Sequence, residues 1–452
     1  MLFERIESEG LAHYSYIIGD GTEAAVIDPR RDVEVYLKKA REQEMDIKYV
    51  LETHRNEDYV VGSREIKNRT ECEIWHADRQ LEYEYGKPVE EGVEFEIGDL
   101  SIEAIHTPGH TPGSMSYLLK EYSGENWALF SGDALFAGDV GRVDLLGMDK
   151  AEENAEALYD SIFNKILKLG DEVLLFPAHG PGSVCAESIA NRKWTTIGIE
   201  KKRNPKLRYD TKKEFVNEIK EKLERPPYFR KMEELNLKPP LLGDIPWPNP
   251  MSPAEFQKQA QDNWVLDTRT ELSYGAAHTP HSISIWKDGV PSFVGWFLDY
   301  QKPISLVTES PQELEKVTKY LIRLGYDEIE GYLSGGMVKW HMSGKNSHSI
   351  EMLTVQDLCE KIDKEKELDI LDVRGKEEIK ENGRIEGAEE IHLTKIKQNI
   401  SKIKELDDIH IFCGSGLRSM IAASILRNKG IKNLKVVLGG LSGWKSNKCH
   451  IK

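Results

Sequence analysis

Short apolar runs separated by turn residues dominate the first two hundred positions, and this pattern predicts strands with helices between them. The runs are rich in β-branched and aromatic residues and end in Gly, Asp or Pro, as strands do; they cover residues 12–18, 24–28, 47–53, 101–107, 127–133 and 172–180. Residues 32–43 and 151–170 show helical spacing, and the second of these closes on a glycine that suits a helix C-terminus. We therefore expect a layered α/β domain.

The end of this domain is marked by a helix and a proline-rich stretch. Thr211 and Glu214 have the spacing of a capping box, and an amphipathic pattern follows them. Eight prolines then lie between residues 226 and 253. Because proline blocks regular structure and stiffens the chain, we expect an extended connector over 225–253.

Beyond the connector, two sequence blocks recur in the same order, which indicates an internal duplication. VLDTRTELSYGAAHTPHSISI (265–285) matches ILDVRGKEEIKENGRIEGAEEI (370–391), and GYDEIEGYLSGGMVKW (325–340) matches GIKNLKVVLGGLSGW (430–444). Each copy shows the βαβ alternation of a parallel sheet. The predicted organisation is therefore a domain over 1–224, the connector 225–253, and two small α/β domains over 254–346 and 347–452.

Composition restricts the possible partners. The chain has 452 residues, of which 39% are hydrophobic and 31% charged, as in soluble globular proteins. The N-terminus lacks the apolar core of a signal peptide, and no window approaches the roughly 20 apolar residues of a membrane helix. The net charge is −16 and no basic stretch is interleaved with aromatics, which argues against nucleic acid and anionic membranes. We expect a cytoplasmic protein.

The five cysteines do not have the spacing of a disulfide framework. Their number is odd, they are widely separated, and no two form a CxxC pair. In the cytosol most are expected to be free thiols, and a reactive one must be recognised by its surroundings. They are Cys72, Cys185, Cys359, Cys413 and Cys449.

Four segments place a candidate metal ligand directly after an apolar strand-like run. They are THRNEDY (53–59), HTPGHTPGS (106–114), FSGDA (130–134) and PAHG (177–180). Loops at strand ends are where a rigid scaffold presents functional groups. A single histidine after a strand is usually structural, but the joint occurrence of all four segments predicts a metal site.

This order of motifs resembles the metallo-β-lactamase superfamily, whose signature is HxHxDH, a His in a TPGHT-like turn, an Asp in a GD motif and a final His. The resemblance implies an αββα layered fold. The chain departs from the signature at Asn56 and Tyr59, which stand where the second and third histidines belong. Each metal of a dinuclear hydrolase would lose an imidazole by these changes, and Asn and Tyr are poorer zinc ligands.

The residues that remain resemble the persulfide dioxygenase branch of the superfamily. His54, His110 and Asp133 supply two imidazoles and one carboxylate, the facial triad of non-haem Fe(II) oxygenases. The resemblance implies one Fe(II) per chain, with zinc as the alternative. Asp58 and His179 are then left to orient the ligands by hydrogen bonds or to act as further ligands.

Further segments resemble the same branch. FAGDVGRVD (136–144) places Arg142 to meet an anionic thiol substrate. DPRR (28–31) and HGPGSVC (179–185) resemble the subgroup that is fused to rhodanese domains. Cys185, in a Gly-rich turn soon after His179, is expected near the site as a substrate contact; the alternative is a small buried residue.

The second copy contains a cysteine in a loop suited to binding an anion. IFCGSGLRS (411–419) places Cys413 after a strand, followed by Gly414, Ser415, Gly416 and a helical pattern. Inward-pointing backbone N–H groups and the helix dipole would lower the pKa of the thiol and make it a nucleophile for sulfur transfer. The segment resembles the rhodanese active-site loop, which implies that Cys413 and Arg418 are catalytic.

The first copy lacks this chemistry. The stretch ISLVTESP (304–311) pairs with the loop of the second copy and places Thr308 opposite Cys413, with no arginine at the expected place. Without a thiolate there is no carrier for persulfide sulfur. We therefore expect a catalytically inactive domain that serves as a scaffold.

The whole chain resembles the bacterial fusion of a persulfide dioxygenase, a pseudo-rhodanese and a rhodanese domain. The resemblance implies that Fe(II) binds a low-molecular-weight thiol persulfide and O2 and that the sulfane sulfur is oxidised to sulfite. Cys413 would then pass sulfane sulfur to sulfite to form thiosulfate, or run the reverse transfer, in sulfide detoxification. The thiol could be glutathione, coenzyme A or bacillithiol, and the branch commonly forms homodimers or homotetramers.

Two other functions are open on the sequence. One is a zinc-dependent thioesterase of the glyoxalase II type, which would need a second metal. The other is a sulfur-relay protein in which only Cys413 works and the metal domain is degenerate. Arg55, Asn56 and Glu57 favour the second alternative because they crowd a motif that usually has small residues.

Overall fold

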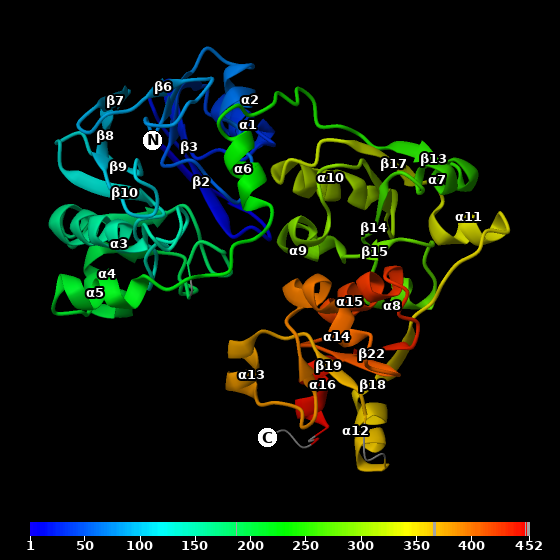
Figure 1. The fold of residues 1–452 in the computed structure, drawn as a ribbon. Helices are drawn as coiled ribbons and strands as arrows, with labels where there is room; N and C mark the ends of the chain where they lie inside the picture. The colour runs from blue at the N-terminus through cyan, green and yellow to red at the C-terminus, as the bar shows by residue number, and fades with distance from the viewer. Residues whose placement is uncertain (187, 365–367, 448, 450–452) are drawn as a thin grey trace. The chain divides into compact units, whose positions relative to one another are not determined.

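A computed structural model describes residues 1–186, 188–364, 368–447 and 449 (Figure 1). The chain forms two compact units. The first comprises Met1–Ile245 with Ile322–Gly325, and the second comprises Pro246–Leu321 and the chain from Tyr326 onward. Among the described residues, no helix is both long enough and apolar enough to span a membrane.

The first unit contains two six-stranded sheets, each in simple sequence order along the sheet (Figure 1). The strands of the first sheet are β1 (Leu2–Ser8), β2 (His13–Asp20), β3 (Glu23–Ile27), β4 (Asp46–Glu52), β5 (Glu73–His76) and β6 (Lys87–Pro88). Those of the second are β7 (Glu94–Ile97), β8 (Leu100–His106), β9 (Met115–Lys120), β10 (Asn126–Gly132), β11 (Leu174–Pro177) and β12 (Thr195–Thr196). The apolar runs of the sequence therefore predict the strands that lead to all four ligand segments.

The sheets pack face to face, with helices on both outer sides. Tyr16 and Ile18 of β2 join residues of the second sheet in the central apolar core, whereas Ile17 between them faces α1 and α2. This alternation follows from the two-residue period of a strand. A third cluster packs α3, α4 and α5 against the second sheet. The layered αββα fold is thus confirmed, with helices α1 (Glu34–Glu42), α2 (Ser63–Lys67), α3 (Ala151–Tyr159), α4 (Ile197–Arg203) and α5 (Lys212–Ile219).

Two local predictions in this unit have different outcomes. The capping box is present, because the Thr211 hydroxyl and the Glu214 carboxylate each bond the other's backbone N–H at the start of α5. The helix predicted over 151–170 instead ends as α3 at Tyr159, continues as a π-helical turn (Asp160–Lys165), and finishes as a 3₁₀ turn (Ile166–Lys168). Apolar spacing alone does not distinguish these closely related helical forms.

The proline-rich stretch is not the uniformly extended connector that its composition predicted. Helix α6 (Phe229–Leu235) and the edge strand β13 (Asn249–Met251) lie within it. The prolines at 226, 227, 239 and 240 flank α6 and do not interrupt it. Proline disrupts a helix only from inside it, so residues between two proline pairs remain free to form one.

The second unit contains two five-stranded parallel sheets with the same topology (Figure 1). The first has the order β13-β17-β16-β14-β15 and the second the order β18-β22-β21-β19-β20. Their further strands are β14 (Trp264–Asp267), β15 (Ile283–Ser284), β16 (Ile304–Val307) and β17 (Ile329–Leu333), and then β18 (Glu351–Thr354), β19 (Ile370–Asp372), β20 (Glu389–Glu390), β21 (Ile409–Phe412) and β22 (Leu434–Leu438). The duplication predicted from the sequence is therefore a duplication of a parallel α/β fold.

Each copy has its own set of helices. Those of the first copy are α7 (Pro253–Gln259), α8 (Glu271–Ala276), α9 (Val290–Phe297), α10 (Leu314–Arg323) and α11 (Gly336–Met342), with 3₁₀ turns at Lys287–Gly289 and Pro311–Glu313. Those of the second are α12 (Val355–Lys364), α13 (Lys376–Asn382), α14 (Ile400–Ile403), α15 (Leu417–Asn428) and α16 (Gly440–Ser446), with a 3₁₀ segment at Leu393–Asn399. The two copies meet where the Ser284 N–H donates to the Ser424 hydroxyl at 3.1 Å.

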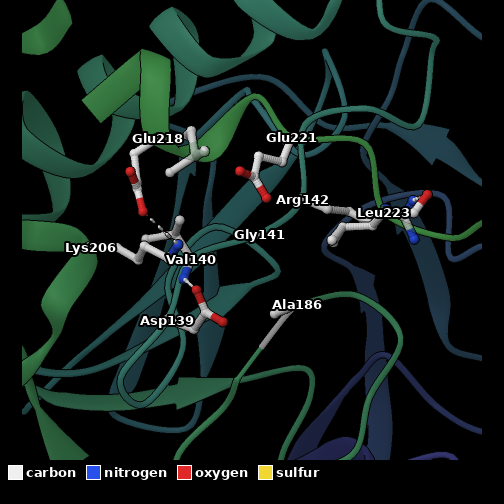
Figure 2. A pocket seen from close by; sticks show the side chains of 10 residues that line it. Asp139, Val140, Gly141, Arg142, Ala186, Lys206, Glu218, Glu221 and Leu223 are labelled. Atoms are coloured by element: carbon white, nitrogen blue, oxygen red, sulfur yellow. Dashed lines mark hydrogen bonds and ion pairs between the residues drawn. The ribbon is translucent and has the colours of Figure 1, made fainter. Parts of the chain in front are cut away.

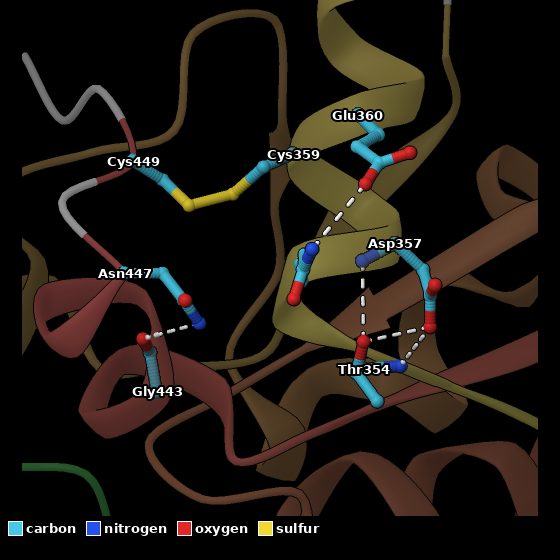
Figure 3. Close-up of a disulfide and its surroundings, with 8 residues drawn as sticks. Thr354, Asp357, Cys359, Glu360, Gly443, Asn447 and Cys449 are labelled. Carbon is cyan, nitrogen blue, oxygen red and sulfur yellow. Dashed lines mark hydrogen bonds between the residues drawn. A yellow bond between two sulfur atoms is a disulfide. The ribbon is translucent and has the colours of Figure 1, made fainter.

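One cysteine pair departs from the expectation of free thiols. Cys359 of α12 and Cys449 form a disulfide across a separation of 90 residues, with their Cα atoms 6.2 Å apart (Figure 3). Cys72, Cys185 and Cys413 are free and buried. Sequence spacing could not show the pair because the two cysteines become neighbours only when α12 packs on the C-terminal segment.

Candidate metal centre

Four strand ends bring the predicted ligands together in the first unit. His54 follows β4, His110 lies in the turn between β8 and β9, Asp133 follows β10, and His179 follows β11. These strands belong to both sheets of the sandwich, so the site lies where the two sheets present loops at a common edge. All four side chains are at most 1% exposed.

Two imidazoles and two carboxylates converge on one small space. The Asp133 Oδ2 atom is 3.9 Å from His54 Nε2 and 3.5 Å from His110 Nε2. Glu57 Oε1 is 3.1 Å from His110 Nε2, and Glu57 Oε2 is 3.8 Å from His54 Nε2. The ligand atoms of His54, Glu57 and His110 lie close enough together to hold one ion.

Hydrogen bonds behind the imidazoles orient them toward this space. The Thr53 hydroxyl donates to Asp28 at 2.7 Å and lies 2.8 Å from His54 Nδ1. His110 Nδ1 donates to the Arg142 carbonyl at 2.9 Å. Because each Nδ1 is engaged from behind, each Nε2 atom is directed inward, which is the orientation found for metal-binding histidines.

His179 is held between two carboxylates. Its Nδ1 atom lies 2.8 Å from Asp133 Oδ1, and its Nε2 atom lies 2.8 Å from Asp58 Oδ2. Burial alone would lower the pKa of His179, but the charges of Asp133 and Asp58 outweigh it and raise that pKa well above its usual value. Burial would likewise raise the pKa of Asp133, and His179 more than offsets this and lowers it. Both ring nitrogens of His179 thus have hydrogen-bonding partners.

Glu57 and His110 also form an ion pair. Burial would raise the pKa of Glu57, but the facing His110 lowers it to about 2. Burial would lower the pKa of His110, but Glu57 raises it to about 9. The buried carboxylates therefore draw positive charge into the space between them, which is the electrostatic requirement of a cation site.

The buried polar atoms that lack a hydrogen-bond partner test whether a metal fits. Buried donors and acceptors are normally satisfied. Among the described residues around this space, the buried atoms without a partner include His54 Nε2, Asn56 Oδ1, Glu57 Oε2, Asp58 Oδ1 and His110 Nε2. Nitrogen and carboxylate oxygen atoms are the ligands that Fe(II) and Zn(II) take, so the donor set fits a divalent ion.

The two residues that replace the family's histidines are engaged elsewhere. The Asn56 amide donates to the His54 carbonyl at 3.3 Å. The Tyr59 hydroxyl donates to the Asp28 carbonyl at 3.2 Å, and its ring lies 3.9 Å from that of His13. Neither side chain supplies an imidazole to a second metal.

Arg142, predicted to meet the substrate, has its guanidinium committed to the protein. It pairs with Asp144 at 2.7 and 2.9 Å and donates to the backbone carbonyls of Val184, Leu223 and Glu224. Figure 2 shows Arg142 beside a small pocket that Glu218 and Glu221 also line. Its visible link to the ligand cluster is the backbone bond to His110, and substrate contact by its side chain stays a prediction.

Cys185 lies against the ligand cluster. Its Sγ atom donates to Glu57 Oε1 at 3.4 Å, and the side chain is fully buried. Burial, with the charges of Glu57, Asp58 and Asp133, raises the pKa of Cys185 well above its usual value. The thiol is therefore a neutral hydrogen-bond donor to Glu57 in this arrangement.

The second candidate site is the cysteine loop of the second unit. Cys413 follows β21, the Gly416 N–H donates to Cys413 Sγ at 3.1 Å, and α15 begins at the next residue. Gly416 has φ of +112°, a conformation that glycine adopts without strain and other residues rarely do. Gly440 also packs closely here, since a Cβ on it would lie 2.2 Å from the Cys413 carbonyl. Arg418 pairs with Glu378 at 2.8 Å.

The corresponding place in the first copy is occupied by Thr308, which follows β16 as Cys413 follows β21. Its hydroxyl donates to the Ser310 carbonyl at 3.1 Å. Pro311, which has no N–H, then begins a 3₁₀ turn before α10. The backbone cradle of the second copy is therefore not reproduced.

Comparison with known proteins identifies the types of the domains. Residues 9–179 match the metallo-β-lactamase superfamily, and residues 252–343 and 354–447 each match the rhodanese-like domain. The chain joins a metallo-β-lactamase domain to two rhodanese-like domains. The metallo-β-lactamase match ends at His179, the last of the four predicted ligand segments.

Relatives of the metallo-β-lactamase domain have different activities. The chain is 29% identical over 214 residues to hydroxyacylglutathione hydrolase GloC of Haemophilus influenzae, covering 43% of this chain and 91% of the relative. It is 28% identical over 220 residues to the mitochondrial persulfide dioxygenase ETHE1 of Bos taurus, covering 47% of this chain and 78% of that protein. A metallo-β-lactamase structure from Staphylococcus aureus matches 74% of this chain and 98% of its own, with a TM-score of 0.67 and 28% identity.

Sequence reasoning missed two residues of the metallo-β-lactamase domain. The sequence indicates Glu57 only as crowding the motif, because residues 53–59 form an irregular loop in which spacing does not show which side chains share a face. Asn236, at the end of α6, donates to the carbonyls of Asn56 and Tyr59 at 2.7 Å and accepts from the Val61 N–H. No sequence signal marks Asn236, because it lies 180 residues from Asn56 in the stretch taken for a connector.

Proposed function

We propose that the metallo-β-lactamase domain is a mononuclear non-haem Fe(II) persulfide dioxygenase with His54, His110 and Asp133 as ligands, acting beside a Cys413 sulfurtransferase. The observation that carries the proposal is that the Nε2 atoms of two histidines, neither with a hydrogen-bond partner, converge on Asp133. Both ring nitrogens of His179, by contrast, are hydrogen-bonded to carboxylates. These features support a single metal position that keeps two imidazoles and a carboxylate, whereas the position beside Asp58 and His179 lacks the imidazole that Tyr59 replaces.

Bound iron would supply the activation of O2 and the binding of the persulfide sulfur. The reaction is RSSH + O2 + H2O → RSH + SO3²⁻ + 2H⁺, in which the sulfane sulfur is oxidised and O2 is reduced. The chain's own part is to fix the imidazoles through Thr53 and Arg142 and to hold Asp133 through His179. The buried setting also excludes bulk water from the reacting sulfur.

Cys413 supplies the second activity. Its sulfur lies before the N-terminus of α15 and accepts the Gly416 N–H, so a backbone donor faces the atom that would carry the sulfur. The thiolate takes sulfane sulfur from a donor persulfide, and the transfer Cys–SSH + SO3²⁻ → Cys–SH + S2O3²⁻ then yields thiosulfate. Glu378 holds Arg418 at the rim of the loop.

The deciding experiment measures metal content and O2 uptake on the same full-length protein. Anaerobically purified chain is expected to hold about one iron, by the stoichiometry of a facial-triad site, and to consume O2 when glutathione persulfide is added. His110→Ala should lose both properties, whereas Cys413→Ser should keep both and lose only thiosulfate formation. Two zinc ions per chain without O2 uptake would contradict the proposal and favour a hydrolase, the class of enzyme named for the Haemophilus relative.

A further inference from the structure

We propose that Glu57 is a fourth protein ligand of this metal ion, so that the site is a two-histidine, two-carboxylate centre. The inference deepens the proposed function and rests on its mononuclear site. Glu57 lies in the loop after β4, three residues beyond His54, and is 1% exposed. A ligand atom of Glu57 also lies within 4.8 Å of one of Asp133.

The distances between donor atoms are those of ligands sharing an ion. Ligand atoms that each lie about 2.0–2.2 Å from a metal are separated from one another by about 3–4 Å. Glu57 is 3.1 Å from His110 Nε2 and 3.8 Å from His54 Nε2. The two distances from Asp133 to the same nitrogens are 3.5 and 3.9 Å. Asp133 approaches both nitrogens with its Oδ2 atom, whereas Glu57 approaches His110 with Oε1 and His54 with Oε2. Both carboxylates therefore lie within ligand-to-ligand distance of the imidazole pair.

The free oxygen of Glu57 supports this assignment. Glu57 Oε1 accepts from the Cys185 thiol at 3.4 Å, while Oε2 is buried without a hydrogen-bond partner. A buried charged oxygen without a partner is unfavourable unless a cation or a donor compensates it. An ion between Glu57, His54 and His110 would compensate this oxygen and both unpartnered Nε2 atoms at once.

The loop is held in the conformation that turns Glu57 inward. Asn236 binds the backbone carbonyls of Asn56 and Tyr59, on either side of Glu57, each at 2.7 Å. The Asn56 side chain is directed to the His54 carbonyl. Asp58, the next carboxylate, is engaged by His179. Of the residues at 56, 57 and 58, Glu57 is the one that faces both imidazoles.

This ligand set has consequences for the ion. Two carboxylates neutralise a divalent cation, and added oxygen ligands favour Fe(II) or Mn(II) over softer ions. Four protein ligands leave two positions of an octahedron, enough for one sulfur substrate and O2. In this ligand set the Glu57 carboxylate adds a fourth protein ligand to a site in which Asn56 supplies no imidazole.

The test measures Fe(II) affinity of the full-length chain under anaerobic conditions by competition with a chromophoric chelator. Glu57→Gln, which keeps the shape and removes the charge, should weaken Fe(II) binding by about 10–100-fold, since even groups that only orient a ligand have effects of this size. Glu200→Gln is the matched control, because Glu200 is equally buried in the same domain but pairs with Arg192. It should leave the affinity unchanged.

A second measurement keeps the proposal testable if Glu57→Gln misfolds. A crystal structure of the unmodified chain loaded with Co(II) should place a Glu57 oxygen within about 2.0–2.2 Å of the ion. Unchanged affinity in Glu57→Gln, or a Co(II) ion beyond the reach of Glu57, would overturn the assignment. A weakened Glu57→Gln site in a protein that takes up no O2 would leave the ligand assignment standing and contradict the dioxygenase instead.

Discussion

The two rhodanese-like domains share a structural framework and differ in the loop that follows one central strand, β16 in the first copy and β21 in the second. In each, an aspartate at the end of an inner strand forms a buried pair with an arginine two residues on: Asp267 with Arg269 at 2.7 Å and Asp372 with Arg374 at 2.6 Å. Each arginine also binds a carbonyl further along its loop, that of Ala277 or Gly383. The domain that lost its nucleophile has therefore kept the interactions that hold the fold.

The difference is confined to the loop after one central strand. After β21 come Cys413, a left-handed glycine and the immediate start of α15. After β16 come Thr308 and a proline-initiated 3₁₀ turn. The two domains therefore differ in the backbone of this loop, where the Gly416 N–H meets Cys413 in one copy and Pro311 follows Thr308 in the other.

The largest effect is expected at the nucleophile. Cys413→Ser should abolish sulfur transfer, a loss of about a thousandfold or more, because a hydroxyl cannot carry persulfide sulfur. Thiosulfate formation from glutathione persulfide and sulfite measures this. Adding Thr308→Cys to that variant should not restore transfer, because the proline-led turn offers no N–H cradle. Restored transfer would show that the thiol alone, and not the loop, distinguishes the domains.

The second-largest expected effect is a loss of stability, and it should be equal in the two rhodanese-like domains. Asp267→Asn and Asp372→Asn each leave a buried arginine without its counter-charge, and each should destabilise its own domain by about 3–5 kcal/mol. Hydrogen–deuterium exchange of the full chain separates the two, since β14 should lose protection in one variant and β19 in the other. A much smaller loss in the first domain would indicate that its framework has also begun to degenerate.

The smallest effect concerns acid stability. Burial lowers the pKa of His278 to about 4, whereas Arg384, the residue at the same place in the second domain, is exposed and paired with Glu390. The unfolded chain therefore binds an extra proton at His278 between about pH 6.5 and 4. The first rhodanese-like domain, which contains His278, should therefore lose up to about 3 kcal/mol of stability as the pH falls through that window.

His278→Gln tests this prediction. The variant should lose the acid sensitivity of the first domain, read as the difference in exchange protection from the unmodified chain at equal pH. Arg384→Gln serves as the control and should change nothing in this window. An equal acid sensitivity in His278→Gln and the unmodified chain would place the titrating group elsewhere.

Much of the fold could be predicted because its strands and helices follow periodic patterns of apolar residues. Alternating apolar residues gave the strands that lead to His54, His110, Asp133 and His179, and the repeated LDTR and LDVR blocks gave the duplicated domain. The capping box at Thr211 was found because it is a local interaction between residues three apart. Such features depend on short stretches of chain.

Other features could not be predicted because they depend on loops that have no period. The backbone of residues 53–59 decides whether Asn56 or Glu57 faces the imidazoles, and Asn236 fixes that backbone from a distant helix. The pairing of Arg142 with Asp144 follows from how the surrounding carbonyls are arranged. The direction in which a side chain of an irregular loop points is set by the residues that pack against the loop.

The sequence by itself determined the fold class and the duplication, and it predicted a set of metal ligands and the cysteine that would carry sulfur. Only the tertiary structure decided that Glu57 joins the ligand cluster, that His179 is shared by two carboxylates, and that Cys359 meets Cys449. The physical reason is that residue type fixes which bonds a side chain can make, whereas the partners it reaches depend on packing between segments far apart in the chain.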